Sequence, residues 1–266
     1  MATEKFTRPA AVAGMFYSNT ATQLRTDIND MLDQAKEISL EKQPLAIIAP
    51  HAGYVYSGPV AATAYRLIRH YADNIHRVIL LGPSHRVPFH GLAMSSASQY
   101  ETPLGTVSID HDSYHKISEH SAVKVLDAAH AQEHSLEVHV PFLQVVLNRF
   151  SLVPLVVGDA DGHTVAEVLE LLDIDSHTLI VVSSDLSHYL DYQSARQRDQ
   201  KTSDAIAHLQ PENIQYEDAC GRNPLNGLLM LAKKHGLHAT MIDLRNSGDT
   251  AGPSDRVVGY GAYVIH

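Results

Sequence analysis

The sequence predicts a single α/β domain over residues 1–266, with a mixed, mostly parallel central sheet flanked by helices. Short apolar runs rich in β-branched residues alternate along the chain with stretches of helical period. The chain contains no internal repeat with a period of about 20–50 residues, and no Gly/Ser-rich or Pro-rich linker divides it. Alternation of this kind favours successive βαβ units, and the missing linker favours one domain.

The apolar runs are typical of strands that are buried on both faces of a sheet. We expect strands at Leu45–Ala49, Arg77–Leu81, Gly91–Met94, Leu152–Val157, Thr178–Val182, Thr240–Leu244 and Val257–Ile265. We expect helices at Thr22–Lys36, Pro59–Tyr71, Leu136–Asn148, Thr164–Leu172, Ala195–His208 and Pro224–His235. The segment Ser95–Asp110, with Pro103 and Gly105 between two alternating stretches, predicts a hairpin or an antiparallel addition to a sheet edge.

The composition excludes several classes of function. Cys220 is the only cysteine, so the chain can form no internal disulfide, thiolate zinc cage or iron–sulfur cluster. The net charge is −10 and the basic residues are scattered, which argues against a nucleic-acid partner. No apolar stretch is long enough for a membrane span, and Met1–Tyr17 lacks a secretory signal, so we expect a cytoplasmic protein.

The unusual feature is a set of 18 histidines, several of which directly follow predicted strands. His51, His85 and His188 each come shortly after a different strand, and the binding crevice of an open α/β sheet lies beyond the carboxyl ends of its strands. His51 and His85 are one βαβ unit apart, so we expect their strands to be neighbours about 4.8 Å apart. A single loop histidine is more often an ordinary surface residue, but three at one edge favour a metal site.

A further histidine lies in the run from Glu133 to His139, at the start of a predicted helix. His134 and His139 would lie about 140° apart around that helix and so could not bind one ion, whereas His134 and Glu137 would share a face. We interpret Glu133, His134 and Glu137 as groups that line the pocket or orient the ligands. A capped amphipathic helix with solvent-facing charges is an equally good interpretation.

The turn Asn246–Gly252 offers one carboxylate, Asp249, at what the predicted topology makes the same edge. An ordinary Asp/Gly turn is the interpretation that the residues alone favour. His51, His85 and Asp249 would nonetheless form the two-histidine, one-carboxylate triad that is typical of non-haem iron(II).

Two other chemistries have weaker support. A serine hydrolase built on Ser184, Asp185 and His188 is disfavoured, because these groups are close neighbours in one loop and do not converge from separate elements. Cys220 precedes a predicted helix, but a buried structural thiol is the favoured interpretation over a reactive one.

Several long motifs resemble those of the Memo family, and they occur in the family's order along the chain. The resembling stretches are Arg8–Tyr17, Pro50–Tyr54 with Tyr56–Gly58, Gly82–His85, Glu133–His139 with Pro141–Leu143, Ser183–Tyr189, Cys220–Arg222 and Val257–Tyr260.

The resemblance implies a fold similar to that of the class III extradiol dioxygenases. It implies metal ligation by His51 and His85, and an acid/base role for His188. Animal members carry a cysteine as the third ligand, whereas the aligned turn here is Ser247–Thr250, in which Asp249 is the candidate replacement. With Asp249 as ligand the expected cofactor is iron(II), with copper, zinc or manganese as alternatives.

Two functions remain open at this point. In the first, the chain is a dioxygenase-like oxidoreductase in which His188, His134 and Glu137 assist the metal. In the second, it is a non-enzymatic protein that binds a phosphorylated or anionic peptide in the same pocket, where Arg222 would matter more than the metal. The ligand is then a small molecule or an anionic peptide, and the resemblance also implies a partner from a radical-SAM system.

Overall fold

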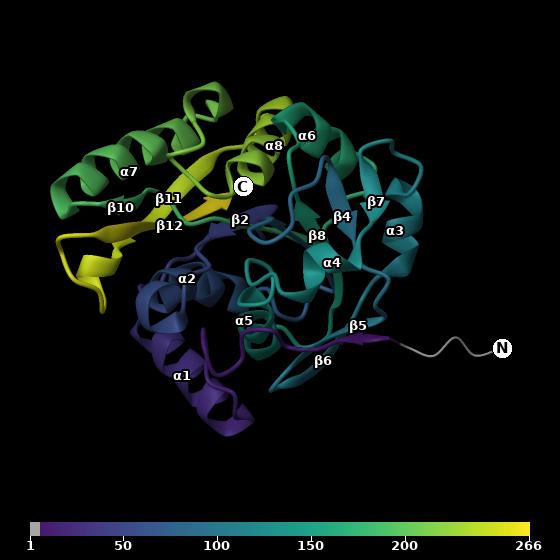
Figure 1. Ribbon diagram of the computed structural model, residues 1–266, viewed down its shortest axis with the longest axis horizontal. Helices are drawn as coiled ribbons and strands as arrows, with labels where there is room; N and C mark the ends of the chain where they lie inside the picture. Colours follow the sequence, from purple (N-terminus) through teal and green to yellow (C-terminus); the bar gives the residue numbers. More distant parts are fainter. Residues whose placement is uncertain (1–5) are drawn as a thin grey trace.

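The computed structural model describes residues 6–266, which form a central mixed sheet with helices on both faces (Figure 1). The strands are β1 (Thr7–Arg8), β2 (Ala46–Ala49), β3 (Arg77–Pro83), β4 (Leu92–Met94), β5 (Gln99–Thr102), β6 (Gly105–Ser108), β7 (Val123–Val125), β8 (Ser151–Val157), β9 (Thr178–Ser183), β10 (His188–Leu190), β11 (Ala239–Asn246) and β12 (Val257–Ile265). The helices are α1 (Ala21–Gln34), α2 (Tyr54–Arg69), α3 (His111–Ile117), α4 (Asp127–Ala131), α5 (His139–Val146), α6 (Gly162–Glu170), α7 (Tyr192–Ala207) and α8 (Arg222–Lys234), with short 3₁₀ turns at Pro211–Asn213 and Ser247–Asp249.

The central sheet has the strand order β10-β12-β2-β9-β3-β8-β4-β7, and β11 pairs with the opposite edge of β12, along Gly259–Ile265. Strands β2, β9, β3 and β8 are parallel, whereas β12 and β4 join this group in antiparallel fashion. Ile48 and Leu81 both pair with Val182, so the carboxyl ends of β2, β9 and β3 lie level with one another. These three ends form the edge at which the histidine loops begin.

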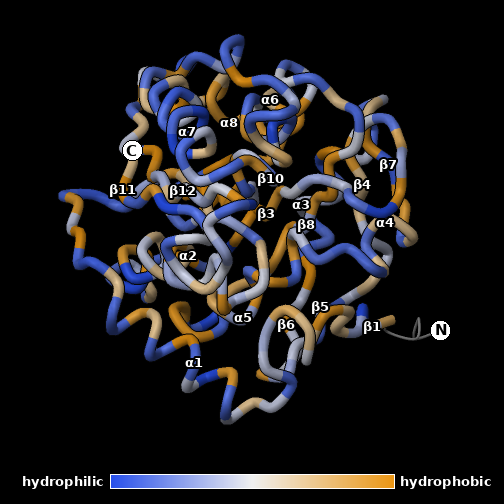
Figure 2. Tube along the Cα trace, turned by 60° about the vertical axis from the view of Figure 1, so that its left-hand side comes forward, coloured by the Kyte–Doolittle hydropathy of each residue, from blue (hydrophilic) through white to orange (hydrophobic). Residues whose placement is uncertain are grey.

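The parallel strands form because their side chains are apolar on both faces. Nearly every residue of β2, β3, β8 and β9 is buried, and Figure 2 shows hydrophobic colour along β3 and β8. Helices α1, α2 and α5 cover one face, and α6, α7 and α8 cover the other (Figure 1). Within residues 6–266, no helix is long and apolar enough to cross a membrane. The predicted α/β class with a mixed sheet flanked by helices is confirmed, while the first five residues of the predicted domain lie outside those described.

Two of the differences between the observed and the predicted helix starts affect the site. Helix α2 begins at Tyr54, five residues before the expected start at Pro59, so that the proline lies inside the helix. Helix α5 begins at His139, three residues after the expected start at Leu136. Pro141 then falls in the first turn of α5, where a proline costs no helical hydrogen bond. Residues 133–134 are consequently irregular and residues 135–138 form turns, which frees the side chain of His134 from helical spacing.

The predicted hairpin is present as β5 and β6, which pair in antiparallel fashion through Thr102 and Gly105. It does not extend the central sheet. Instead, β1 adds to β5 in parallel, and the three strands form a small sheet of their own. This arrangement places the start of the described chain next to the segment that carries His134.

A buried ion pair attaches the N-terminal segment to that region. Arg8 is 2% exposed and its guanidinium donates to the fully buried carboxylate of Glu137 and to the carbonyl oxygens of His130 and Glu133. Glu137 also accepts from the backbone N–H groups of residues 11 and 12, at 2.8 and 2.9 Å, and from the hydroxyl of Tyr17 at 2.6 Å. The carboxylate therefore organises about ten residues of otherwise irregular chain.

Replacing Arg8 with alanine should strongly destabilise the fold, because Glu137 would keep its buried charge without its cationic partner. We expect the free energy of unfolding, measured by urea denaturation, to fall by about 3–5 kcal/mol. Arg25→Ala removes an exposed arginine from α1 and should change it by less than about 0.5 kcal/mol. Equal stabilities of the two variants would contradict the structural role of this pair.

Candidate metal centre

Three histidine rings meet at the carboxyl edge of the central sheet. His51 follows β2, His85 follows β3, and His134 lies in the irregular segment before α5. The ring centroids of His51 and His85 are 5.1 Å apart, those of His51 and His134 are 5.4 Å apart, and those of His85 and His134 are 4.6 Å apart. One nitrogen from each ring lies within 4.8 Å of the others, so the three can serve as ligands of a single metal ion.

The strands that carry His51 and His85 are not neighbours, contrary to the prediction. Strand β9 lies between β2 and β3 and pairs in parallel with both. The two histidines still meet because both loops extend beyond the end of β9. The inserted strand also contributes to the site, because the hydroxyl of its last residue, Ser183, hydrogen-bonds the His51 ring.

Ser183 fixes the orientation and the tautomer of His51. The Ser183 hydroxyl donates its proton to the carbonyl oxygen of Ser135 at 2.6 Å, so its oxygen can only accept from His51 Nδ1 at 2.6 Å and from His139 Nε2 at 3.0 Å. His139 Nδ1 in turn accepts from the hydroxyl of Tyr65 at 2.8 Å. His51 therefore carries its proton on Nδ1, and its Nε2 presents a lone pair to the site.

Glu133 has the same role for His85. Its carboxylate accepts from His85 Nδ1 at 2.9 Å and from the His85 backbone N–H at 2.6 Å. Burial acts to raise the pKa of Glu133, but hydrogen bonds from His85 and from the Ser135 backbone outweigh it and lower this pKa to about 2. An ionised carboxylate thus holds the ring with Nε2 free, which is the usual support of a metal-bound histidine.

The cluster can bind a cation because burial holds the rings of His51 and His134 neutral. Burial, followed by the nearby His85, lowers the pKa of His51 well below its usual value and that of His134 to about 4. His134 Nδ1 is buried and has no hydrogen-bond partner among residues 6–266, although Glu133 Oε1 is 3.4 Å away. A buried, unpartnered nitrogen is costly, and a metal ion or a bound ligand would satisfy it.

Asp249 is not part of the cluster. Its carboxylate accepts from the backbone N–H of Asn246 at 2.9 Å, completing a capping box, and from the hydroxyl of Tyr192 at 2.7 Å. Asp249 lines a different cavity, which shares no residue with the one around the histidines. The predicted triad of His51, His85 and Asp249 is therefore not assembled, and His134 provides the third nitrogen instead.

Of the two other predicted catalytic residues, Glu137 lies away from the pocket and His188 lines it. Glu137 faces the N-terminal segment and not the pocket, since its hydrogen bonds all go to Arg8, Tyr17 and the chain between them. His188 does line the pocket, and its Nδ1 donates to the carbonyl oxygen of Leu186 at 2.8 Å, which leaves Nε2 available. The next residue, Tyr189, has a φ of 63°, a strained backbone conformation of the kind that often occurs at functional sites.

The pocket has a volume of about 820 Å³ and is lined by charged and aromatic groups as well as by the histidines. Cys220 Sγ lies 3.3 Å from His51 Nε2, and burial followed by the charge of Asp185 raises the pKa of this thiol. Sequence analysis did not place Cys220 at the site, because the loop before α8 carries no metal-ligand spacing. Ser184 bonds to its own loop and to the Gly221 N–H and not to His188, so no hydrolase triad is formed.

Fold and site together define an α/β protein with a histidine cluster, able to hold a metal ion, at the carboxyl edge of its sheet. A family model described as Memo-like protein matches residues 8–264. The chain belongs to this family, as its motifs predicted. It is 32% identical to a MEMO1 family protein of Thermoplasma volcanium over 97% of each chain, and 34% identical to one of Aquifex aeolicus over 95% of this chain and 97% of the relative. A MEMO1 family protein of Methanosarcina mazei is 33% identical over 97% of this chain and 98% of the relative.

Metal content should depend on His134 and not on Asp249. We expect His134→Ala to lose most of the metal that the wild-type protein binds after anaerobic purification without a tag, because one of three nitrogen ligands is removed. Asp249→Asn should retain it, since the carboxylate accepts from Asn246 and Tyr192 and lies outside the cluster. Mass spectrometry measures the metal bound per chain in each variant and in the wild type. Loss of metal in the Asp249 variant alone would contradict this assignment.

The buried histidines should make the fold sensitive to acid. Burial lowers the pKa of His130 to about 4 and that of His139 to about 3, from the usual 6.5. Below pH 6.5 the unfolded state then binds more protons than the folded state. The stability that depends on these neutral rings is therefore fully present above pH 6.5 and is lost as the pH falls towards 4. Unfolding free energies measured in urea between about pH 6 and pH 5 should fall by about 1.4 kcal/mol for each of these histidines.

The matched variants separate this effect from general acid denaturation. His139→Gln should flatten the pH dependence, whereas His70→Gln, at an exposed position after α2, should leave it unchanged. An unchanged slope in the His139 variant would show that this ring does not cause the acid sensitivity.

Proposed function

We propose that this protein is a metal-dependent oxidoreductase with dioxygenase-like chemistry, in which His51, His85 and His134 hold iron(II). The observation that carries the proposal is the cluster of three convergent rings, of which those of His51 and His85 have Nδ1 fixed by hydrogen bonds. Proteins use this arrangement to present Nε2 lone pairs to a divalent transition metal.

The donor set narrows the choice of metal. Three imidazoles suit iron, copper or zinc, whereas manganese prefers oxygen ligands, which this cluster lacks without Asp249. Three protein ligands would leave positions open for a substrate. Bound iron would supply the oxygen-activating chemistry, and the protein would bind and orient the substrate and transfer protons.

The residues around the cluster fit these tasks. His188 Nε2 faces the pocket with its tautomer fixed by Leu186, so it can accept a proton from a substrate hydroxyl and return it later. Phe89 and Tyr216 line the pocket with aromatic surface, and Arg222 adds a positive charge. A planar substrate with an ionisable hydroxyl or an anionic group matches this lining.

A second candidate function is supported by the arginines of the same pocket. Arg198 and Arg222 both line it. Among residues 6–266 the Arg222 guanidinium donates only to the side-chain oxygen of Asn223 and packs over the Tyr216 ring, whereas Arg198 pairs with Asp218 at 3.4 Å. A protein that binds a phosphorylated or anionic peptide here, without catalysis, would use these guanidinium groups. For either function we propose a cytoplasmic location, and we extend the partner proposal to a radical-SAM system on the basis of family membership.

The enzymatic proposal predicts oxygen consumption by the iron-loaded protein with a catechol as substrate, together with ring-cleaved product. His188→Ala should lower kcat by about 100-fold or more without loss of iron, because it removes the proton-accepting group and none of the metal ligands. Oxygen electrode and product analysis measure this. Iron-loaded protein that consumes no oxygen with any catechol tested would sink the enzymatic proposal, and phenyl phosphate binding that survives a chelator would favour the binding function.

A further inference from the structure

The proton transfer proposed for His188 requires a fixed ring, but the strand that carries this residue gives it little support. Strand β10 is three residues long and pairs with β12 only through His188 and Leu190, with an irregular register between them. Tyr189, the residue between these two, has a φ of 63°, a conformation that persists only where the surrounding structure enforces it. The contacts that fix the His188 ring must therefore come from outside β10.

These contacts converge on the backbone of the preceding residue, Ser187. Its N–H group donates to Oδ1 of Asp199 at 3.0 Å, and its carbonyl oxygen accepts from the N–H group of Gly259 at 2.8 Å. Both backbone hydrogen-bonding groups are thus held from outside the loop, the first by α7 and the second by β12. His188 Nδ1 then reaches the carbonyl oxygen of Leu186, which is the contact that fixes its tautomer.

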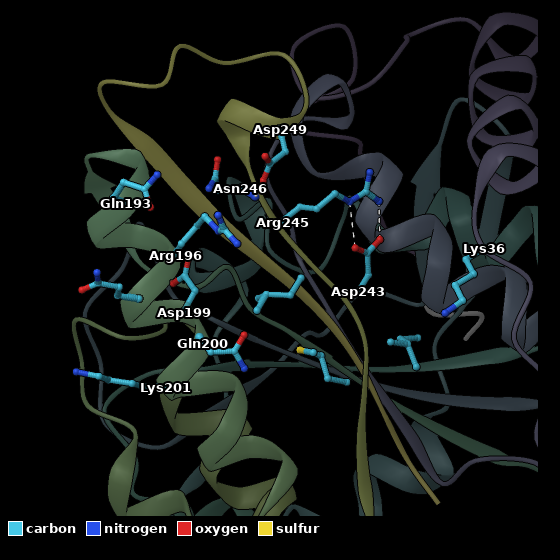
Figure 3. A pocket seen from close by; sticks show the side chains of 14 residues that line it. Lys36, Gln193, Arg196, Asp199, Gln200, Lys201, Asp243, Arg245, Asn246 and Asp249 are labelled. Atoms are coloured by element: carbon cyan, nitrogen blue, oxygen red, sulfur yellow. Dashed lines mark hydrogen bonds and ion pairs between the residues drawn. The ribbon is translucent and has the colours of Figure 1, made fainter.

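Asp199 is a buried carboxylate that forms no ion pair among residues 6–266. It is 2% exposed, and Figure 3 shows it on the side of α7 that faces β11 and β12. Burial raises the pKa of Asp199 above its usual value. A carboxylate in this position costs stability, because it loses its water and gains no cation. Its presence is therefore better explained by the N–H group that it holds than by a contribution to the stability of the fold.

Strand β12 leaves room for this carboxylate at Gly259. A Cβ atom on Gly259 would overlap Asp199 Oδ2. The φ of Gly259 lies outside the left-handed region, so the backbone conformation does not require glycine at this position. The glycine is instead explained by the space that the Asp199 carboxylate occupies.

We propose that Asp199 is a positioning residue for His188: by holding the Ser187 N–H group, it fixes the turn that presents His188 Nε2 to the histidine pocket. Asp199 does not line that pocket, so it acts on the reaction only through the backbone of Ser187. The effect on catalysis rests on the function proposed for His188. The effect on the orientation of the ring can be measured without any turnover.

The catalytic test compares Asp199→Ala with Asp199→Asn in iron-loaded protein with a catechol as substrate. Asparagine keeps an oxygen that can accept from the Ser187 N–H group but carries no charge, whereas alanine has neither. We expect Asp199→Ala to lower kcat by about tenfold or more, with KM changed by less than about twofold and with unchanged iron content, because only the ring that takes the proton is displaced. Asp199→Asn should retain kcat within about threefold. Asp204→Ala, at an exposed position on the same helix, is the matched control and should behave as the wild type.

The structural test uses nitrogen-15 NMR of metal-free protein labelled at histidine. At about pH 8, above the usual pKa of histidine, the spectrum reports which ring nitrogen of His188 carries the proton, and the signal missing from His188→Gln assigns it. We expect a single tautomer, protonated on Nδ1, in the wild type, in Asp199→Asn and in Asp204→Ala. We expect mixed tautomers in Asp199→Ala and in Gly259→Ala, whose new methyl group would displace the carboxylate.

The proposal is overturned if Asp199→Ala keeps either the wild-type tautomer or the wild-type kcat. It is also overturned if Asp199→Asn loses as much activity as Asp199→Ala, since the effect would then come from charge and not from position. If Asp199→Ala does not fold, as judged by circular dichroism, Gly259→Ala tests the same contact from the opposite strand. A wild-type protein without turnover would contradict the function proposed for the metal centre, and the tautomer comparison would then decide the role of Asp199 by itself.

Discussion

The geometry of the histidine cluster depends on the buried carboxylate of Glu133. This one group accepts from the ring and the backbone of His85 and from the backbone of Ser135, and so joins the loop after β3 to the turns before α5. Because its pKa is held near 2, the group is ionised throughout the physiological range. It orients His85, fixes the segment that carries His134, and places a negative charge beside the position where a cation would bind.

Two further buried groups extend this control through the fold. Ser183, at the end of the strand that separates β2 from β3, fixes His51 as Glu133 fixes His85. The Arg8–Glu137 pair holds the N-terminal segment against the same turns, and this segment carries Phe16, whose ring packs 4.7 Å from that of His134. Groups that stabilise the fold are thus the groups that arrange the site, and disturbing either will affect the other.

The sequence was sufficient for the parts of the structure that follow from local pattern. The positions of the longer strands and helices, and the placement of His51 and His85 at one sheet edge, follow from apolar periodicity and from the rule that loops after parallel strands form the crevice. The short elements β1, β7, β10, α3 and α4 have too little periodicity to be predicted in this way. Strand order is not encoded locally, so the insertion of β9 was missed. His134 was assigned to a helix because the apolar run begins at Leu136, and the later start at His139 became evident only in the structure. Asp249 was a plausible ligand by composition, but its carboxylate is used by its own turn, a choice that depends on tertiary contact with Tyr192.

Diffraction at the metal's absorption edge would show whether His51, His85 and His134 bind one metal ion. In crystals of anaerobically purified protein, we expect a single strong anomalous peak about 2.0–2.2 Å from one nitrogen of each of the three rings. A peak on Asp249, a peak that contacts only one of the rings, or none at the cluster in a protein that contains metal, would contradict it.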